Sequence, residues 1–239
     1  MPKPFEELAY HQTTRGELIL RRRHYAMLGD EPIYEVLLNE EWLMSSLFHA
    51  AEEALAYRAL EWLKAFEGPL DLVVGGLGLG YTALAALSHP EVGSLRVIEV
   101  FPEVIEWYQD RLIPSSDALV QDPRCRLVAG DFFAMTREQG YDEEDPTRQF
   151  HGVLLDIDHT HEHWLHPDHA AFYSIEALGR LRDRLVPAGV FAMWADGAAH
   201  SQFQTTLRKT FAESVALEVR FPNPIQGGES SSTIYLARK

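Results

Sequence analysis

The sequence contains a single cysteine, Cys125, so no disulfide can form within the chain. It also lacks the charged start, apolar run and small-residue cleavage site of a secretory signal. No uninterrupted apolar stretch approaches the roughly 20 residues that an α-helix needs to cross a bilayer. We therefore expect a cytoplasmic protein that carries no internal disulfide and does not span a membrane.

Positive charge is scarce. The chain has 21 Lys and Arg against 36 Asp and Glu, and its formal net charge at pH 7 is −15. This balance argues against nucleic-acid binding and favours the approach of small cationic molecules. With 46% hydrophobic residues, a chain of 239 residues can form one main globular domain, but it is short for two.

The first 49 residues are predicted to form a small β-hairpin region, ahead of a main domain over residues 50–239. Two strand-like runs, at residues 16–20 and 33–38, are separated by a turn region that contains glycine and proline. Apolar residues at helical spacing over residues 50–66 predict a helix that leads into the main domain.

Short apolar runs alternate with helical stretches in the main domain, at residues 70–74, 95–100, 126–128, 152–156 and 190–194. This alternation predicts a doubly wound parallel sheet with helices on both faces. Two further strands, at residues 215–221 and 233–237, have no helix between them and must pair antiparallel. The predicted fold class is α/β, a Rossmann-like methyltransferase fold whose mostly parallel sheet has an antiparallel terminal strand. The polar segment 137–149 is predicted to be an exposed loop.

Four glycines follow the first of these runs, Gly75, Gly76, Gly78 and Gly80, and a helical stretch comes after them. Glycine lets the backbone approach a bound nucleoside closely and adopts the positive φ angles of tight turns. We therefore expect this loop to bind a cofactor. Because Gly78 and Gly80 also fit a dinucleotide fingerprint, a nicotinamide enzyme and a tight turn without a ligand stay as alternatives.

An acidic residue lies at or just after the end of each of the next two runs. Glu99 comes about 20 residues after the glycines, where a carboxylate can accept hydrogen bonds from ribose hydroxyls, with a solvated strand end as the alternative. Asp131 precedes two phenylalanines, so it could hold an adenine amino group beside aromatic rings that stack on the base. Asp131 could also cap the helix behind it, and the two roles are compatible.

The fourth run ends in two carboxylates, Asp156 and Asp158, at the edge where open α/β sheets bind ligands. Asp156 is the candidate to orient an amine nucleophile and accept its proton, or to hold a cationic substrate. Asp158 is the second catalytic candidate, because residues two apart on a strand share a face. The alternative is a carboxylate that only caps the next element.

Five of the 11 histidines lie between residues 159 and 169. Imidazoles beside an acidic residue can bind zinc or iron, but the spacing here matches no established ligand set, so we expect no metal. These histidines could instead titrate near neutral pH and tune a pocket. His159, Trp164 and Tyr173 are candidates for contact with the substrate, although the two aromatic residues could equally be ordinary packing.

The order of the glycine loop, Glu99, Asp131 and Asp156 resembles that of the spermidine synthases and their relatives, which have the class I S-adenosylmethionine-dependent methyltransferase fold. The resemblance implies that Glu99 binds the ribose, that Asp131 binds the adenine amino group and that Asp156 is the catalytic acid–base. It also implies a donor that is S-adenosylmethionine or its decarboxylated form, a small cationic amine as acceptor, and a homodimer.

The resemblance covers most of the chain. Residues 42–46 and a helix that bears Glu53 and Tyr57 are similar to that family's small β domain and its following helix, which makes Tyr57 a substrate-binding candidate. Two features depart from the family. Gly78 stands where its glycine loop usually has an aspartate for the donor's amino group, and residues 156–160 read Asp-Ile-Asp-His-Thr instead of Asp-Ser-Ser/Thr-Asp-Pro.

These departures leave the acceptor open. Aminopropyl transfer, methyl transfer to a substrate other than a polyamine, and a non-catalytic nucleoside-binding protein that lost the polyamine site all stay as alternatives. A nicotinamide oxidoreductase is the weakest of them, because it gives no reason for Asp131 or for the two final strands.

Overall fold

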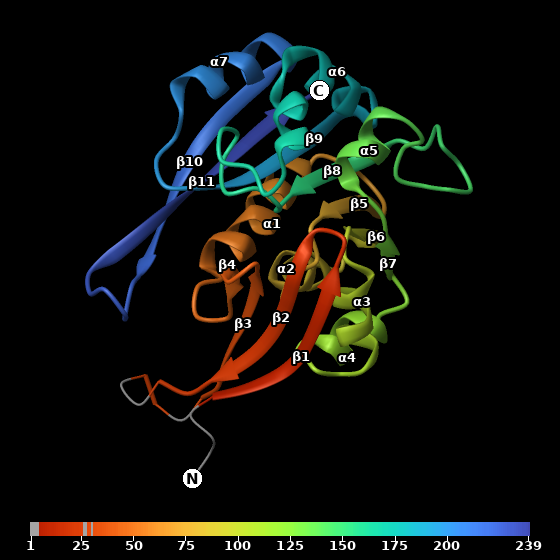
Figure 1. The fold of residues 1–239 in the computed structure, drawn as a ribbon. Coiled ribbons are helices and arrows are strands. Elements are labelled where there is room, and N and C mark those ends of the chain that lie inside the picture. The colour runs from red at the N-terminus through yellow and green to blue at the C-terminus, as the bar shows by residue number, and fades with distance from the viewer. Residues whose placement is uncertain (1–4, 26–27, 30) are drawn as a thin grey trace.

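The protein contains two β-sheets, which are built from different parts of the chain (Figure 1). The computed structural model describes residues 5–25, 28–29 and 31–239. A four-stranded sheet comes from the N-terminal part, and a seven-stranded sheet with helices on both faces comes from the rest.

The N-terminal sheet is antiparallel, with strands in the order β1-β2-β3-β4. Its strands are β1 (Phe5–Thr13), β2 (Gly16–Arg23), β3 (Ile33–Leu38) and β4 (Glu41–Ser45). The sequence predicted β2 and β3 and missed the two outer strands, so the expected hairpin is a four-stranded sheet. β1 alternates half-buried with exposed residues and has none that is fully buried, so its hydrophobic signal is weak.

The larger sheet has the strand order β10-β11-β9-β8-β5-β6-β7. Its strands are β5 (Leu70–Gly75), β6 (Val92–Glu99), β7 (Cys125–Ala129), β8 (Phe150–Leu155), β9 (Leu185–Asp196), β10 (Glu213–Pro222) and β11 (Glu229–Arg238). The five strands from β5 to β9 pair parallel, and β11 pairs antiparallel with both β9 and β10. The predicted Rossmann-like fold with an antiparallel terminal strand is confirmed.

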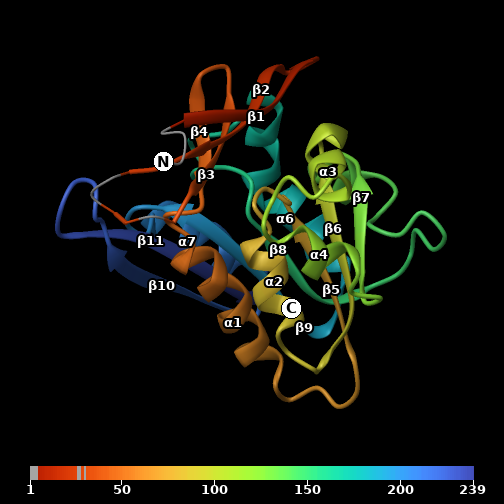
Figure 2. The same cartoon turned by 90° about the horizontal axis from the view of Figure 1, so that it is seen from below.

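Helices cover both faces of this sheet (Figures 1 and 2). They are α1 (Ala50–Leu63), α2 (Tyr81–Leu87), α3 (Pro102–Gln109), α4 (Ser116–Val120), α5 (Phe132–Arg137), the 3₁₀ helix η1 (Pro167–Tyr173), α6 (Ile175–Asp183) and α7 (Ser201–Thr210). Successive residues of β5 point to opposite faces, so Leu72 and Val74 pack into the core with α1 and α2, and Val73 packs into the core with α6 and α7.

The polar segment between α5 and β8 contains no helix or strand, as predicted, but it is not exposed throughout. Tyr141 and Asp142 are buried. The Asp142 carboxylate accepts hydrogen bonds from Arg96 at 2.5 Å and from Arg148 at 2.9 Å. Two paired guanidinium groups therefore compensate a carboxylate that the sequence alone placed in solvent.

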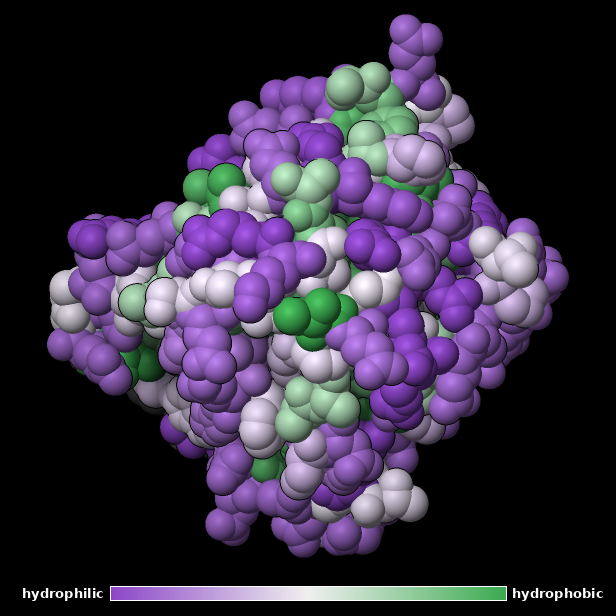
Figure 3. Space-filling model, turned by 90° about the horizontal axis from the view of Figure 1, so that it is seen from above, coloured by the Kyte–Doolittle hydropathy of each residue, from purple (hydrophilic) through white to green (hydrophobic). Residues whose placement is uncertain are grey.

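The face of the molecule in Figure 3 is mostly hydrophilic, with its hydrophobic side chains in small separate groups. Within the described ranges, no helix combines the length and the apolar character that crossing a membrane requires.

The winding direction of the sheet changes between β5 and β8, which makes the carboxyl ends of these two strands the expected place for a ligand. From β5 the chain winds outward through β6 and β7 on one side, and β8 and β9 lie on the other. A ligand crevice forms at such a switch of direction in open α/β sheets. The N-terminal sheet lies beside this edge and is tied to α3, since the Trp107 indole donates a hydrogen bond to His11 of β1 at 3.2 Å.

Candidate functional site

Two adjoining pockets lie at the carboxyl ends of β5, β6 and β8. One, called here the apolar pocket, is lined by Leu18, Phe101 and Phe133 together with the carboxylates Glu99 and Asp131. The other, called the acidic pocket, is lined by Glu52, Tyr81, His159 and Trp194. The residues that line both pockets are Leu43, Met44, Gly76, Gly78, Asp156 and Ile157.

The glycine loop lies between the two pockets. Gly76 has φ +96°, and a Cβ there would lie 2.1 Å from the Asp156 carbonyl oxygen, so only glycine fits. Beside Gly78, φ +47°, the Met44 thioether fills the space that a side chain would occupy, with Cε 2.2 Å from a Cβ placed there. Gly80 lines the acidic pocket, whereas Gly75 lines neither pocket and packs against the Phe132 ring. Contacts within the protein therefore already require glycine in this loop, whether or not a ligand also approaches it.

Glu99 is buried in the wall of the apolar pocket. Its two carboxylate oxygens accept hydrogen bonds from the backbone N–H groups of Leu77 and Phe101, each at 3.0 Å. Burial raises the pKa of Glu99, and these backbone donors oppose the shift. Glu99 thus holds the glycine loop against the start of α3 and places its carboxylate in the pocket wall.

Asp131 caps α5, as the sequence allowed. Its Oδ1 accepts hydrogen bonds from the N–H groups of Phe133 at 2.9 Å and Ala134 at 3.0 Å. Its Oδ2 accepts one from Arg15, in the turn between β1 and β2, at 3.0 Å. Burial acts to raise the pKa of Asp131, but the Ala134 N–H and the Arg15 charge outweigh it and hold the pKa below its usual range. Sequence reasoning missed Arg15, because 116 residues separate the partners.

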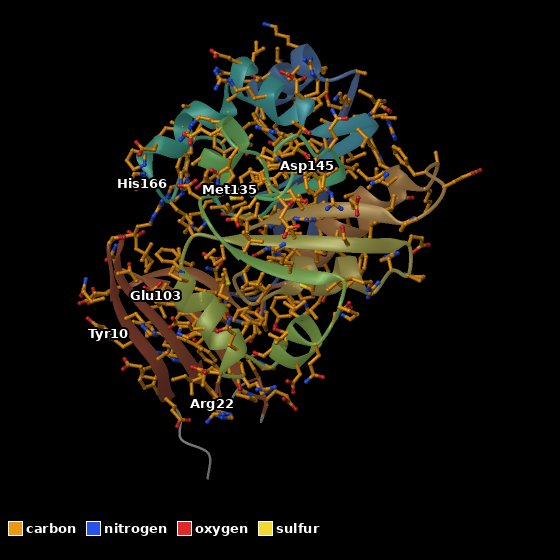
Figure 4. The ribbon with its side chains drawn as sticks, turned by 90° about the vertical axis from the view of Figure 1, so that its right-hand side faces the viewer. Tyr10, Arg22, Glu103, Met135, Asp145 and His166 are labelled. Atoms are coloured by element: carbon orange, nitrogen blue, oxygen red, sulfur yellow. The ribbon has the colours of Figure 1, made fainter. Side chains whose placement is uncertain are left out.

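The N-terminal sheet thereby contributes to the apolar pocket. In Figure 4 this sheet, which carries Tyr10 and Arg22, lies beside α3 with Glu103, and the segment of His166 lies above it. Leu18 and Val36 of the sheet line the pocket together with Arg15.

Asp156 follows β8 directly and faces both pockets. Its Oδ2 accepts a hydrogen bond from the Thr82 hydroxyl at 2.7 Å, and its backbone N–H donates to the Gly75 carbonyl at 2.9 Å. Burial raises the pKa of Asp156 to about 6, although the Thr82 hydroxyl acts against the shift. A positioned carboxylate with a pKa near neutrality is suited to general acid–base chemistry.

Glu52, in the first turn of α1, is a second carboxylate of the acidic pocket. Burial, and after it the negative charge of Asp156, raises the pKa of Glu52 to about 8. The two carboxyl groups therefore retain a proton at pH values where a free carboxyl group has lost it. The sequence analysis singled out the neighbouring Glu53, which instead pairs with His49 at 2.8 Å. Only the packing of α1 decides which of two adjacent glutamates faces the sheet.

Asp158 has a different environment from Asp156. It is buried, with Oδ1 accepting hydrogen bonds from the Leu165 N–H at 2.9 Å and His169 at 2.8 Å, and Oδ2 accepting one from the Tyr173 hydroxyl at 2.7 Å. Neither Asp158 nor Tyr173 lines either of the two pockets. The strand-alternation argument does not apply, because β8 ends at Leu155. Asp158 organises the segment after the strand.

Of the remaining substrate-binding candidates, one lines a pocket and two lie outside both pockets. His159 lines the acidic pocket. Its pKa is lowered mainly by burial and, to a smaller extent, by the charge of the nearby His163. Tyr57 is exposed on α1 against His89, away from both pockets, because five residues of helix place it about 140° around the axis from Glu52. Trp164 is also exposed outside them, and its indole donates to the His161 carbonyl at 2.8 Å.

Trp194 of β9 was not identified from the sequence. Trp194 lines the acidic pocket, and its buried indole N–H has no hydrogen-bond partner within the described residues. A buried donor without a partner can serve a ligand. Its signal in the sequence is indistinguishable from that of the other apolar residues of the strand.

No family model matches the sequence. The chain is 26% identical over 230 residues to polyamine aminopropyltransferase 2 of Pseudomonas aeruginosa, covering 92% of this chain and 62% of that protein. It is 29% identical over 136 residues to the polyamine aminopropyltransferase of Corynebacterium efficiens, covering 56% of this chain and 24% of that protein. This chain is a distant homologue of the polyamine aminopropyltransferases.

Solved structures agree with this homology at the level of the fold. Spermidine synthase from Thermotoga maritima superposes with a TM-score of 0.72 at 18% identity, covering 98% of this chain and 72% of that chain. A spermidine synthase in complex with the transition state analogue AdoDATO gives a TM-score of 0.72 at 17% identity, covering 98% and 73%. A probable spermidine synthase from Corynebacterium glutamicum gives 0.64 at 14% identity, covering 96% and 79%. The predicted resemblance to the aminopropyltransferase family is confirmed.

Proposed function

We propose that this protein transfers an aminopropyl group from decarboxylated S-adenosylmethionine to a small cationic amine. The observation that carries the proposal is the meeting of the two pockets at Asp156: one has the groups to hold an adenosine, and the other has the charge to hold an amine. The homology to polyamine aminopropyltransferases supports the same reaction class.

The apolar pocket would hold the nucleoside of the donor. It combines apolar walls with the two carboxylates Glu99 and Asp131, a lining typical of small-molecule sites. Glu99 would accept hydrogen bonds from the ribose hydroxyls, and Asp131 would accept one from the adenine amino group. Because Arg15 already pairs with Asp131 Oδ2 at 3.0 Å, the ligand must share or displace this contact.

The acidic pocket would hold the acceptor. Glu52 and Asp156 present carboxylates to an ammonium group, and bringing a positive charge beside them favours release of their retained proton. The negative charge of Glu52 and Asp156 disfavours a donor that carries its own carboxylate. We therefore propose the decarboxylated donor, and with it aminopropyl rather than methyl transfer.

In the transfer, the neutral amine nitrogen attacks the methylene carbon bound to the sulfonium. The new C–N bond forms as the C–S bond breaks, the electron pair stays on sulfur, and methylthioadenosine leaves as a neutral thioether. Asp156, held by the Thr82 hydroxyl at 2.7 Å, accepts the proton that the amine gives up. The residues otherwise act by aligning the two reactants for in-line displacement.

Parallel calorimetric titrations test the donor site. We expect methylthioadenosine and decarboxylated S-adenosylmethionine to bind, S-adenosylmethionine to bind more weakly than its decarboxylated form, and NAD to bind weakest. Tightest binding of S-adenosylmethionine would instead indicate methyl transfer. A preference for NAD, or no nucleoside binding, would overturn the proposal.

A further inference from the structure

A histidine outside the two pockets has unexplained surroundings. The His161 side chain is only 9% exposed, and neither of its ring nitrogens has a hydrogen-bond partner among the described residues. Its ring stacks on Phe203, with centroids 4.9 Å apart. A neutral imidazole carries one donor and one acceptor nitrogen, and buried polar atoms are normally satisfied. His161 therefore lacks a partner that its environment leads one to expect.

Two potential metal ligands lie next to it. His161 Nε2 is 3.7 Å from Glu162 Oε1, and His200 Nδ1 is 3.8 Å from Glu162 Oε2. One ligand atom from each of the three residues lies within 4.8 Å of the others. His161 and Glu162 belong to the segment after β8, whereas His200 precedes α7, so two separate parts of the chain meet here.

We propose that His161, Glu162 and His200 form a binding site for a divalent transition metal ion of the zinc class. Two imidazoles and one carboxylate are a common zinc ligand set, with water at the fourth position. Glu162 is 61% exposed and His200 is 44% exposed, so the ion can enter from solvent and keep that water.

The geometry needs only a local adjustment. Ligand atoms at about 2.0–2.2 Å from zinc in a tetrahedral site lie roughly 3.3–3.6 Å apart, compared with up to 4.8 Å here. The exposed side chains of Glu162 and His200 can make up the difference by rotation, while Phe203 holds the His161 ring in place. Burial, and after it the charge of the neighbouring His200, lowers the pKa of His161, a shift that favours the neutral ring.

An ion pair alone does not account for this cluster. The Glu162 contacts at 3.7 and 3.8 Å are longer than hydrogen bonds, and they leave both His161 nitrogens unsatisfied. Because Nδ1 of His161 has no acceptor within the described part of the chain, the site lacks the supporting contact typical of tight zinc centres. We therefore expect an exchangeable ion that ties the segment carrying His159 to α7. This inference does not depend on the proposed transferase activity.

The test uses the full-length protein without an affinity tag, freed of metal by dialysis against EDTA. Zinc chloride is titrated by calorimetry, and cobalt(II) binding is followed by visible absorption. We expect one ion per chain, a zinc-induced rise in Tm, and affinities that fall by more than about 10-fold in His200→Ala and in Glu162→Gln.

His163→Ala is the matched control, because His163 lies in the same segment and packs against His159, with centroids 4.8 Å apart. This variant should bind zinc like the unmodified protein. The exposed positions 162 and 200 decide the test even if substitution of the buried His161 impairs folding. Absence of zinc binding in the unmodified protein, unchanged affinity in His200→Ala, or an equal loss in His163→Ala would each overturn the assignment.

Discussion

Asp156 and Asp158 lie two residues apart and have opposite surroundings. Asp156 accepts a hydrogen bond from Thr82 and opens to both pockets, whereas Asp158 is surrounded by donors from Leu165, His169 and Tyr173. The sequence predicted that carboxylates gather at this edge of the sheet. It could not separate their roles, because these depend on the path of the chain after β8.

Replacing each aspartate should therefore have a different effect. In Asp156→Asn we expect methylthioadenosine release to slow by about 100- to 10,000-fold, with little change in donor affinity, because the base is lost and the nucleoside contacts stay. In Asp158→Asn we expect a loss of stability of about 2 kcal/mol, or roughly 5 °C in Tm, since an amide cannot accept all three hydrogen bonds.

Rates and thermal unfolding measured on both variants decide between the two roles. Full activity in Asp156→Asn together with loss of activity in a stable Asp158→Asn would move the catalytic role to Asp158.

The ribose-binding role proposed for Glu99 can be tested by a single substitution. Glu99→Ala should weaken methylthioadenosine binding by about 1.5 to 3 kcal/mol, because it removes a charged acceptor and releases the Leu77 and Phe101 amides that shape the loop. Calorimetry gives the affinity, and Glu106→Ala, an exposed change on α3, is the control. Unchanged affinity in a folded Glu99→Ala variant would refute the ribose-binding role.

At the scale of elements, the meeting of α1 with the end of β8 brings two carboxyl groups together. Their pKa values are raised to about 8 for Glu52 and about 6 for Asp156. A carboxyl group whose pKa is higher in the folded chain binds more protons there than in the unfolded chain, so stability falls as the pH rises between roughly 4 and 8.

Glu52→Gln should reduce this dependence. We expect the variant to be more stable than the unmodified protein by about 1–2 kcal/mol at pH 8.5 and to lose that advantage at pH 4.5. Urea unfolding at the two pH values measures the difference, and Glu53→Gln on the same turn is the control. Parallel pH profiles for Glu52→Gln and the unmodified protein would show that the two carboxyl groups do not share a proton.

The sequence predicted some of the helices and strands and missed others. Apolar runs predicted β5 and β8, and spacing predicted α1, because burial imposes a periodic pattern on these segments. β1 and β4 were missed, since β1 has no fully buried residue and β4 is short with a single buried one. Long-range contacts were missed as well: Arg15 reaches Asp131, and His200 reaches His161, only through the assembled fold.

At the scale of the whole molecule, the site forms where the N-terminal sheet meets the larger sheet. The ion pair of Arg15 with Asp131 and the packing of Met44 on Gly78 both cross this boundary. Gly78 stands where the resemblance implies an aspartate, and the Met44 thioether fills the space beside it. The net charge of −15 adds a long-range attraction for small cationic molecules.

Aminopropyl transfer is measured directly as the release of methylthioadenosine from decarboxylated S-adenosylmethionine, with and without putrescine, by chromatography with mass detection. We expect release that requires the amine and that falls on the order of 100-fold or more in Asp156→Asn. Release at the same rate without an amine, or no release with any small amine although the donor binds, would contradict the proposed transfer.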